Sequence, residues 1–263
     1  MADYTELEKN IKTIIDDLKG LCSTNGLSNT AGEEIVVTSV FLYKFLNDKF
    51  MSNLRKFAIE INGSNLSESE IQNKILEITS DVDMMDAFYD TYPQDVALAY
   101  EDTIDYLVNF VSDQDFYKKF DDTLERISNY PQNDDFSVDT AEGTKRYLFT
   151  PLTVYIEPSK RNAFVKSIFS YITRDRFDFG SAFDSNYDFF STIFEYLISD
   201  YNVASGKYAE YFTPQALSKA IGKILVNMSP VEDTIYDIYD PSAGSGSLVL
   251  HLANELGHGK FGN

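Results

Sequence analysis

The stretch TIYDIYDPSAGSGSLVL, residues 234–250, decides the fold class of this chain. Its first part, TIYDIY (234–239), predicts a short β-strand, and the glycine-rich part predicts a tight turn. An apolar helix is expected from Leu248 to Leu256. Upstream, Thr213 suits a helix N-cap and Pro214 the first helical position, which predicts a helix to about Met228. Helix, strand, glycine turn and helix are typical of the opening of an α/β sheet.

The glycine turn predicts a ligand site. Ligands of open α/β sheets bind beyond the carboxyl ends of the strands. Gly244 and Gly246 lack a Cβ, so a ligand can approach the backbone closely. The following helix offers free N–H groups to an anion, and Asp240 offers a fixed negative charge. This combination suits a ligand that carries both charges, such as an amino acid moiety.

Two common phosphate-binding motifs fail at this turn. A P-loop requires a lysine after its second glycine, and Ser247 follows Gly246 here. A dinucleotide fingerprint requires a third glycine where Val249 stands. The remaining interpretations are a turn that binds S-adenosylmethionine and a plain strand-to-helix turn without a ligand.

A second segment bears on this choice. Tyr211-Phe212-Thr213-Pro214 precedes Asp240 by about 26 residues. An aromatic pair that leads into a capped helix can fold back against the same crevice, and aromatic rings suit an adenosyl group. Taken alone, the segment is better explained as a helix cap with core aromatics.

The first 200 residues carry mostly helical periodicity. Two S/T-x-x-E capping boxes, at Thr30 with Glu33 and at Ser67 with Glu70, each open an apolar run. Pro93 is expected to start a further helix. The other expected helices cover about 7–21, 116–127, 164–172 and 190–197, and residues 136–158 give no clear prediction.

Composition restricts the class of protein. The 263 residues are 43% hydrophobic, which is enough for a packed core, and fit one large or two ordinary domains. Cys22 is the only cysteine, so no internal disulfide exists. The N-terminus lacks the apolar core of a secretory signal and no apolar run is long enough to span a membrane, which predicts a soluble cytoplasmic protein.

Charge bears on the partners. With 22 basic and 42 acidic residues the net charge is −20, which opposes strong nonspecific binding to DNA. If the protein acts on DNA, other segments or subunits should supply most of the cationic contacts. One basic stretch, at 158–180, could meet a polyanion or an acidic partner, although a solvated helix face explains it better. His251, His258 and Cys22 have no metal-ligand spacing, so no metal site is expected.

Together, SGKYAEYFTP (205–214) and DPSAGSGSLVL (240–250) resemble the modification subunit of type I restriction–modification systems. Those subunits are DNA adenine-N6 methyltransferases that use S-adenosylmethionine. The preceding FEYL (194–197) also matches, and GEEIVVTSVFLYKFLNDKF (32–50) is similar to the start of the family's helical N-terminal domain. The resemblance covers about residues 190–263, and more weakly about 30–55.

The resemblance implies two sets of cofactor contacts. Asp240 would hold the amino group of the methionine moiety and the backbone of Gly244–Gly246 its carboxylate, while Thr213 and the neighbouring aromatics would close the other side. Ser247 stands where the family often has glycine. The implied cofactor-binding residues are Glu210, Tyr211, Phe212, Thr213, Pro214, Gln215, Asp240, Ser242, Gly244, Ser245, Gly246 and Ser247.

One family element is absent from the sequence. The catalytic tetrapeptide Asn-Pro-Pro-(Phe/Tyr) does not occur, because the chain contains no Pro-Pro pair. In such enzymes this element hydrogen-bonds the target amino group and stacks on the flipped adenine. No catalytic residue is therefore assigned, and the chain is expected to be the N-terminal portion of such a subunit and inactive alone.

These observations predict a mainly α-helical N-terminal domain at 1–185. A linking helix and the incomplete start of a Rossmann-like methyltransferase domain should follow at 186–263. The resemblance implies a specificity subunit, a restriction subunit and DNA as partners. Two alternatives stay open: a helical module that docks partner proteins, and the N-terminal part of a single-chain restriction–modification enzyme.

Overall fold

The structure is a computed structural model in which the chain divides into two compact units. Residues 1–187 form the N-terminal unit and residues 188–263 the C-terminal unit. The structure describes residues 4–63, 66–139, 143–174, 177–179, 213, 215–228, 236–243 and 246–256.

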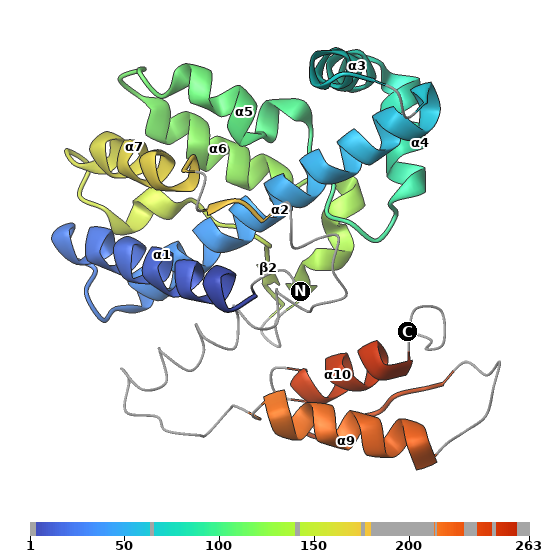
Figure 1. The fold of residues 1–263 in the computed structure, drawn as a ribbon. Helices are drawn as coiled ribbons and strands as arrows, with labels where there is room; N and C mark the ends of the chain where they lie inside the picture. Colours follow the sequence, from blue (N-terminus) through green and yellow to red (C-terminus); the bar gives the residue numbers. More distant parts are fainter. Residues whose placement is uncertain are drawn as a thin grey trace. The chain divides into compact units, whose positions relative to one another are not determined.

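Helices dominate the described part of the N-terminal unit (Figure 1). The α-helices are α1 (Tyr4–Thr24), α2 (Ala31–Asn62), α3 (Glu68–Ser80), α4 (Val82–Thr91), α5 (Ile104–Leu107), α6 (Phe116–Ser128) and α7 (Arg161–Ile172). The 3-10 helices are η1 (Tyr100–Asp102), η2 (Val108–Phe110), η3 (Pro131–Phe136) and η4 (Leu152–Tyr155). The prediction of a mainly helical region is confirmed.

Both predicted capping boxes start helices. At α3 the box is complete, with Ser67 Oγ accepting from the Glu70 N–H and the Glu70 carboxylate accepting from the Ser67 N–H. At α2, Thr30 Oγ1 accepts from the Glu33 N–H at 3.2 Å. The Glu33 carboxylate accepts from the N–H of Asn29 instead of that of Thr30. The second half of this box is therefore displaced by one residue.

The helix predicted to start at Pro93 is wrong. Residues 96–99 have no regular secondary structure, and the next α-helix starts at Ile104. The buried side chain of Asn133 bonds both the N–H and the C=O of Ala97, at 2.7 and 2.9 Å, and so holds this segment extended. Thr103 Oγ1 then provides the N-cap of α5. A contact 36 residues away thus overrides the local helix signal.

Aromatic side chains fill the core where α6 and α7 meet. The Phe169 ring lies edge-on to those of Phe116 and Phe120, with centroids 4.7 and 5.1 Å apart. Tyr43 of α2 adds a further edge-on contact with Phe120. Such edge-to-face pairs stabilise beyond the area that they bury.

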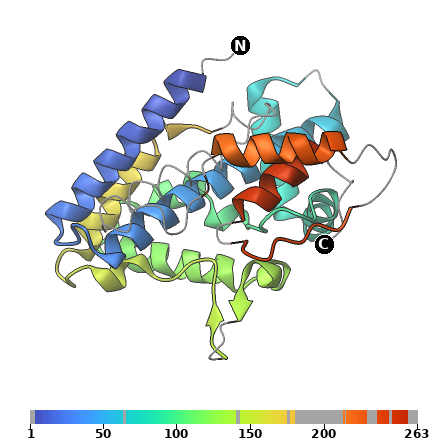
Figure 2. The same cartoon turned by 90° about the horizontal axis from the view of Figure 1, so that it is seen from below.

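The segment without a sequence prediction, 136–158, forms a hairpin and a 3-10 helix. The strands β1 (Val138–Asp139) and β2 (Lys145–Arg146) pair antiparallel, and the hairpin projects from the helical body in Figure 2. The carboxylate of Asp121 anchors η4, because it accepts hydrogen bonds from the Leu152 and Thr153 N–H groups and from the Thr153 hydroxyl.

In the C-terminal unit, α9 (Gln215–Met228) packs against α10 (Ser247–Leu256), as Figure 1 shows. Gly222 permits a close approach, since a Cβ at this position would lie 3.3 Å from the carbonyl oxygen of His251. Both helices confirm the sequence prediction. The helix predicted at 190–197 lies outside the described residues.

The predicted strand at 234–239 is only partly borne out. Tyr236 is an isolated bridge residue, and residues 237–239 have no regular secondary structure. Residues 234 and 235 lie outside the described part. A strand is extended by pairing with neighbours, and the described residues of this unit contain no second strand that could pair along 237–239.

Candidate functional site

The candidate site is the turn between Tyr236 and α10. Asp240 comes four residues after the bridge residue Tyr236, and its side chain bends toward Ser242 in the turn. Its Oδ1 accepts from the Ser242 N–H at 2.9 Å and from the Ser242 hydroxyl at 3.4 Å. This arrangement is an Asx turn, which fixes the carboxylate at the start of the loop.

The second carboxylate oxygen of Asp240 is the unusual feature. Asp240 Oδ2 is buried and has no hydrogen-bond partner in the described structure. Leaving a buried acceptor unsatisfied is costly, and the cost is larger when the acceptor is charged. A cationic or N–H-bearing group that enters the turn would therefore gain a prepared acceptor.

The other end of the turn leads directly into α10. Gly246 has a φ of +77°, a left-handed conformation that favours glycine. Its N–H donates to the carbonyl of Ala243 at 2.7 Å, and its own carbonyl accepts from the Leu250 N–H at 2.9 Å. The first turn of α10 thus begins right after Gly246, where helix N–H groups lack partners within the helix and favour an anion.

A fixed carboxylate and a helix N-terminus therefore lie at the two ends of one seven-residue turn, 240–246. A ligand with an ammonium and a carboxylate group on adjacent atoms matches this pair of charges. Such an arrangement can bind and orient a ligand that carries both charges.

The structure describes some of the predicted cofactor residues. Asp240, Ser242 and Gly246 lie together in the turn, and Thr213 is half-buried two residues before the start of α9. For Gln215 and Ser247 only the backbone is described. Outside the described residues lie Glu210, Tyr211, Phe212, Pro214, Gly244 and Ser245. A shared hollow between the aromatic segment and the glycine turn therefore stays a prediction.

Sequence reasoning missed the Asx turn. The signal was present, because aspartate two residues before a loop N–H is the usual pattern for such a turn, and Asp240-Pro241-Ser242 has it. The sequence does not show that one carboxylate oxygen of Asp240 has a hydrogen-bond partner and the other has none, since that depends on the packing around the turn.

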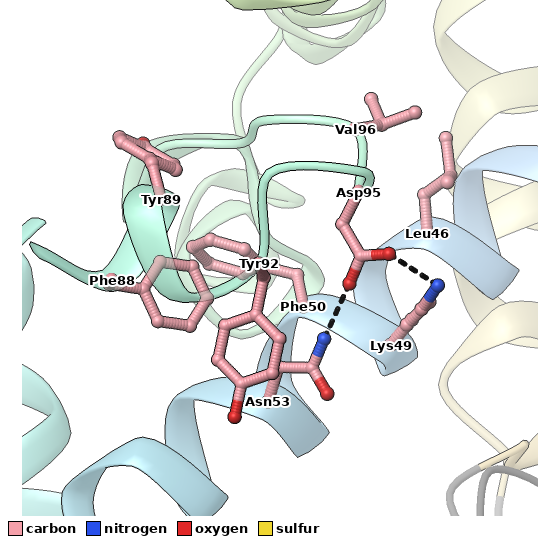
Figure 3. Close-up of a pocket in the computed structure, with 9 residues that line it drawn as sticks. All are labelled: Leu46, Lys49, Phe50, Asn53, Phe88, Tyr89, Tyr92, Asp95 and Val96. Carbon is pink, nitrogen blue, oxygen red and sulfur yellow. Dashed lines mark hydrogen bonds and ion pairs between the residues drawn. The ribbon is translucent and has the colours of Figure 1, made fainter. Parts of the chain in front are cut away.

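The N-terminal unit holds a small pocket between α2 and α4 (Figure 3). Asp95 dominates it, accepting from Asn53 Nδ2 at 2.6 Å and pairing with Lys49. The cavity volume is about 20 Å³, enough for one water molecule. The Asp95 carboxylate in this pocket is already paired by Lys49 and Asn53.

The basic stretch at 158–180 uses several of its cations for local contacts. Lys166 donates to the carbonyl of Ser112 at 3.1 Å, and Arg161 donates to the carbonyl of Ile156 at 3.1 Å. The Arg174 guanidinium lies 4.2 Å from the ring centroid of Tyr171. Arg176 lies outside the described residues. The described contacts favour a helix surface over a site for a polyanion.

The described part of the chain contains no group of three or more His, Cys, Asp or Glu side chains arranged to hold a metal ion. It also contains no helix with the length and apolar character required to cross a bilayer.

Comparisons with known proteins find similarity in the C-terminal part of the chain. Residues 185–261 match the N-6 DNA Methylase family. The type I restriction enzyme MpnII methylase subunit of Mycoplasma pneumoniae is 40% identical to this chain over 74 residues. That alignment covers 28% of this chain and 13% of the Mycoplasma protein. No solved structure shows significant similarity to the chain.

The C-terminal part of the chain is therefore similar to the N-6 DNA Methylase family and to the methylase subunit of a type I restriction enzyme. The matched segment spans only a small fraction of this Mycoplasma relative.

Proposed function

We propose that residues 186–263 form the start of a Rossmann-like methyltransferase domain that binds S-adenosylmethionine, and that residues 1–185 form its helical N-terminal domain. The single observation that carries the proposal is the buried, unsatisfied Asp240 Oδ2 at one end of a turn that leads into a helix N-terminus. The match of residues 185–261 to N-6 DNA methylases supports the choice of cofactor, because methyltransferases of this family normally use it.

In this proposal each end of the turn holds one charge of the methionine moiety. The Asp240 carboxylate accepts from the ammonium group. The N–H groups at the start of α10, with the backbone of Gly244 to Gly246, receive the carboxylate. Thr213, flanked by Glu210, Tyr211, Phe212, Pro214 and Gln215, closes the adenosyl side. When bound, the cofactor supplies an electrophilic methyl group on its sulfonium.

The whole protein would transfer this methyl group to adenine N6 in DNA, in a cytoplasmic complex with a specificity subunit and a restriction subunit. The type I methylase relative supports this assignment. The net charge of −20 is consistent with a division of labour in which other chains supply most of the contacts to the phosphate backbone.

Residues 1–263 alone should transfer no methyl group. Their sequence lacks an Asn-Pro-Pro-(Phe/Tyr) element, so nothing equivalent would hold the target amino group and stack on the base. Incubation with tritiated S-adenosylmethionine and adenine-containing DNA should leave the DNA unlabelled, and turnover would contradict this part of the proposal.

Isothermal titration of the full chain with S-adenosylmethionine tests the proposal. We expect saturable binding that Asp240→Asn weakens by about tenfold or more, because one charge-assisted hydrogen bond contributes roughly 1.5–3 kcal/mol. Asp237→Asn is the matched control, since Asp237 is exposed in the same loop. Binding that is absent, or equally affected by both variants, would contradict the proposed site.

A further inference from the structure

A hollow with a volume of about 560 Å³ lies beside α2 in the N-terminal unit. Its lining comes from α2, from α5 and η2, and from the end of α7. Pockets of about 300–1,000 Å³ are typical of sites for small molecules. The cavity beside Asp95, in contrast, has room for one water molecule. The hollow beside α2 therefore has the size of a ligand site.

Three polar side chains of α2 line this hollow, although each is more than nine-tenths buried. Lys44, Asn47 and Asp48 are 8%, 5% and 8% exposed. Lys44 Nζ and Asn47 Nδ2 both donate to Asp48 Oδ1, at 2.8 and 2.9 Å. Asp48 Oδ2 accepts from the Phe179 N–H at 3.0 Å. Both oxygens of the Asp48 carboxylate are therefore engaged by groups of the chain itself.

Hydrogen-bond donors remain in excess in this part of the hollow. A lysine ammonium has three N–H donors and an asparagine amide has two. Among the described residues, Asp48 is the one acceptor for the Lys44 ammonium and for the Asn47 amide. Arg174 adds a guanidinium whose Nε donates to the Ser170 carbonyl, and its other N–H groups have no acceptor in the described chain. Since buried donors without acceptors cost free energy, a ligand that brings oxygen acceptors is favoured here.

The mouth of the hollow has a different chemistry. Asp105 and Asp178 also line the hollow, and both are exposed to solvent. Exposed charges are screened by salt, and a carboxylate accepts hydrogen bonds from hydroxyl groups. The buried side chains of Ile104 and Ile172 offer apolar surface to carbon atoms. The lining thus fits a molecule with an oxyanion at one end and hydroxyl groups at the other.

We propose that this hollow binds a small hydroxylated oxyanion, which is a phosphate or a carboxylate on a carbon frame that carries hydroxyl groups. The oxyanion accepts hydrogen bonds from Lys44, Asn47 and Arg174, and the hydroxyl groups donate to Asp105 and Asp178. All of these residues belong to the N-terminal unit, so the site is independent of the proposed methyltransferase function.

Isothermal titration of the full chain with ribose 5-phosphate and with gluconate tests the proposal. These two probes differ in the oxyanion and share a hydroxyl-bearing frame, while inorganic phosphate and ribose are the separate halves of the first probe. We expect at least one of the two probes to bind saturably, and at least tenfold more tightly than inorganic phosphate or ribose. Binding of ribose 5-phosphate alone would identify the oxyanion as a phosphate, and binding of gluconate alone as a carboxylate.

Arg174→Gln should weaken this binding by about tenfold, because it removes a charge-assisted hydrogen bond to the oxyanion. Arg174 is exposed, so the variant should keep the fold. Arg146→Gln is the matched control, since Arg146 is an exposed arginine of β2 outside the lining. Lys44→Met should weaken binding further, but it leaves the buried Asp48 carboxylate unpaired. Arg174→Gln therefore decides the test if Lys44→Met does not fold.

Four outcomes would overturn the proposal. The first two are the absence of binding by either probe and equally tight binding of inorganic phosphate or ribose, which would indicate an adventitious ion or additive only. The third is an equal effect of Arg174→Gln and Arg146→Gln. The fourth is loss of probe binding in Asp240→Asn, which would place the probe in the turn of the C-terminal unit. Because S-adenosylmethionine is absent from these titrations, their failure leaves the proposed function untouched.

Discussion

At the scale of single residues, Asp102 links the N-terminal unit together. Its side chain is fully buried and accepts from the Arg126 guanidinium, from the Tyr130 hydroxyl at 2.7 Å and from the Ala99 N–H at 2.9 Å. Its backbone carbonyl accepts from the Tyr43 hydroxyl at 2.7 Å. Asp102 thereby links three segments: its carboxylate holds η1 to the end of α6 and Tyr130, and its backbone carbonyl holds Tyr43 of α2.

Asp102→Ala should lower the free energy of unfolding by about 1–3 kcal/mol, because it removes the charged acceptor of three part-buried donors, on Ala99, Arg126 and Tyr130. Urea unfolding followed by circular dichroism measures this. Asp115→Ala is the control, since Asp115 is largely exposed and lies 3.9 Å from Lys118, and should change the value by less than about 0.5 kcal/mol. Equal effects of the two variants would refute the role of Asp102.

Cys22 gives a prediction about pH. Burial, with a smaller contribution from Glu33, raises its pKa from 9.0 to about 12. The folded chain therefore favours the neutral thiol, and this contribution to stability is complete below pH 9 and declines as the pH rises toward 12. Iodoacetamide should react with Cys22 slowly at pH 8 in buffer and quickly in denaturant. Rapid reaction in buffer would show that the thiol is accessible.

At the scale of elements, sequence patterns predicted the helix starts that depend on contacts between neighbouring residues. Ser67 with Glu70, and Thr30 with Glu33, predicted the starts of α3 and α2 because a cap is a contact between neighbours. The prediction failed at Pro93 because Asn133 holds Ala97 extended from 36 residues away. No local pattern contains that contact.

The candidate site divides in the same way. The glycine turn, Asp240 and the helix that follows could be predicted, since each has a short-range signature. The orphaned Asp240 Oδ2 could not, because burial depends on the packing around the loop. Of the strand predicted at 234–239, the described residues contain only the bridge at Tyr236. A strand forms by pairing with another strand, and the described part of this unit contains no strand that pairs along 237–239.

Two glycines within helices should respond oppositely to substitution. Gly222→Leu would push α9 away from the His251 carbonyl, and overpacking of this kind costs about 1–3 kcal/mol. Gly20→Ala in α1 meets no atom within 4 Å and should stabilise its helix by about 0.5–1 kcal/mol. Amide hydrogen exchange of the two helices measures both. Unchanged protection of α9 and α10 in Gly222→Leu would show that this helix contact is unimportant.

At the scale of the whole molecule, the N-terminal unit has its own core. Aromatic contacts between α2, α6 and α7, together with the network around Asp102, all lie within residues 1–187. Residues 1–187 expressed alone should therefore unfold cooperatively in urea and keep the hydrogen-exchange protection that α2 and α6 have in the full chain. Loss of that protection would show that the unit depends on residues 188–263.

The central claim is that the turn from Asp240 into α10 seats the methionine moiety of S-adenosylmethionine. Ultraviolet photolabelling of the full chain with methyl-labelled S-adenosylmethionine, followed by peptide mapping, tests it most directly. The account predicts label within residues 210–215 or 240–247, suppressed by excess S-adenosylhomocysteine and by Asp240→Asn. Label confined to residues 1–187, or label that Asp240→Asn leaves unchanged, would contradict it.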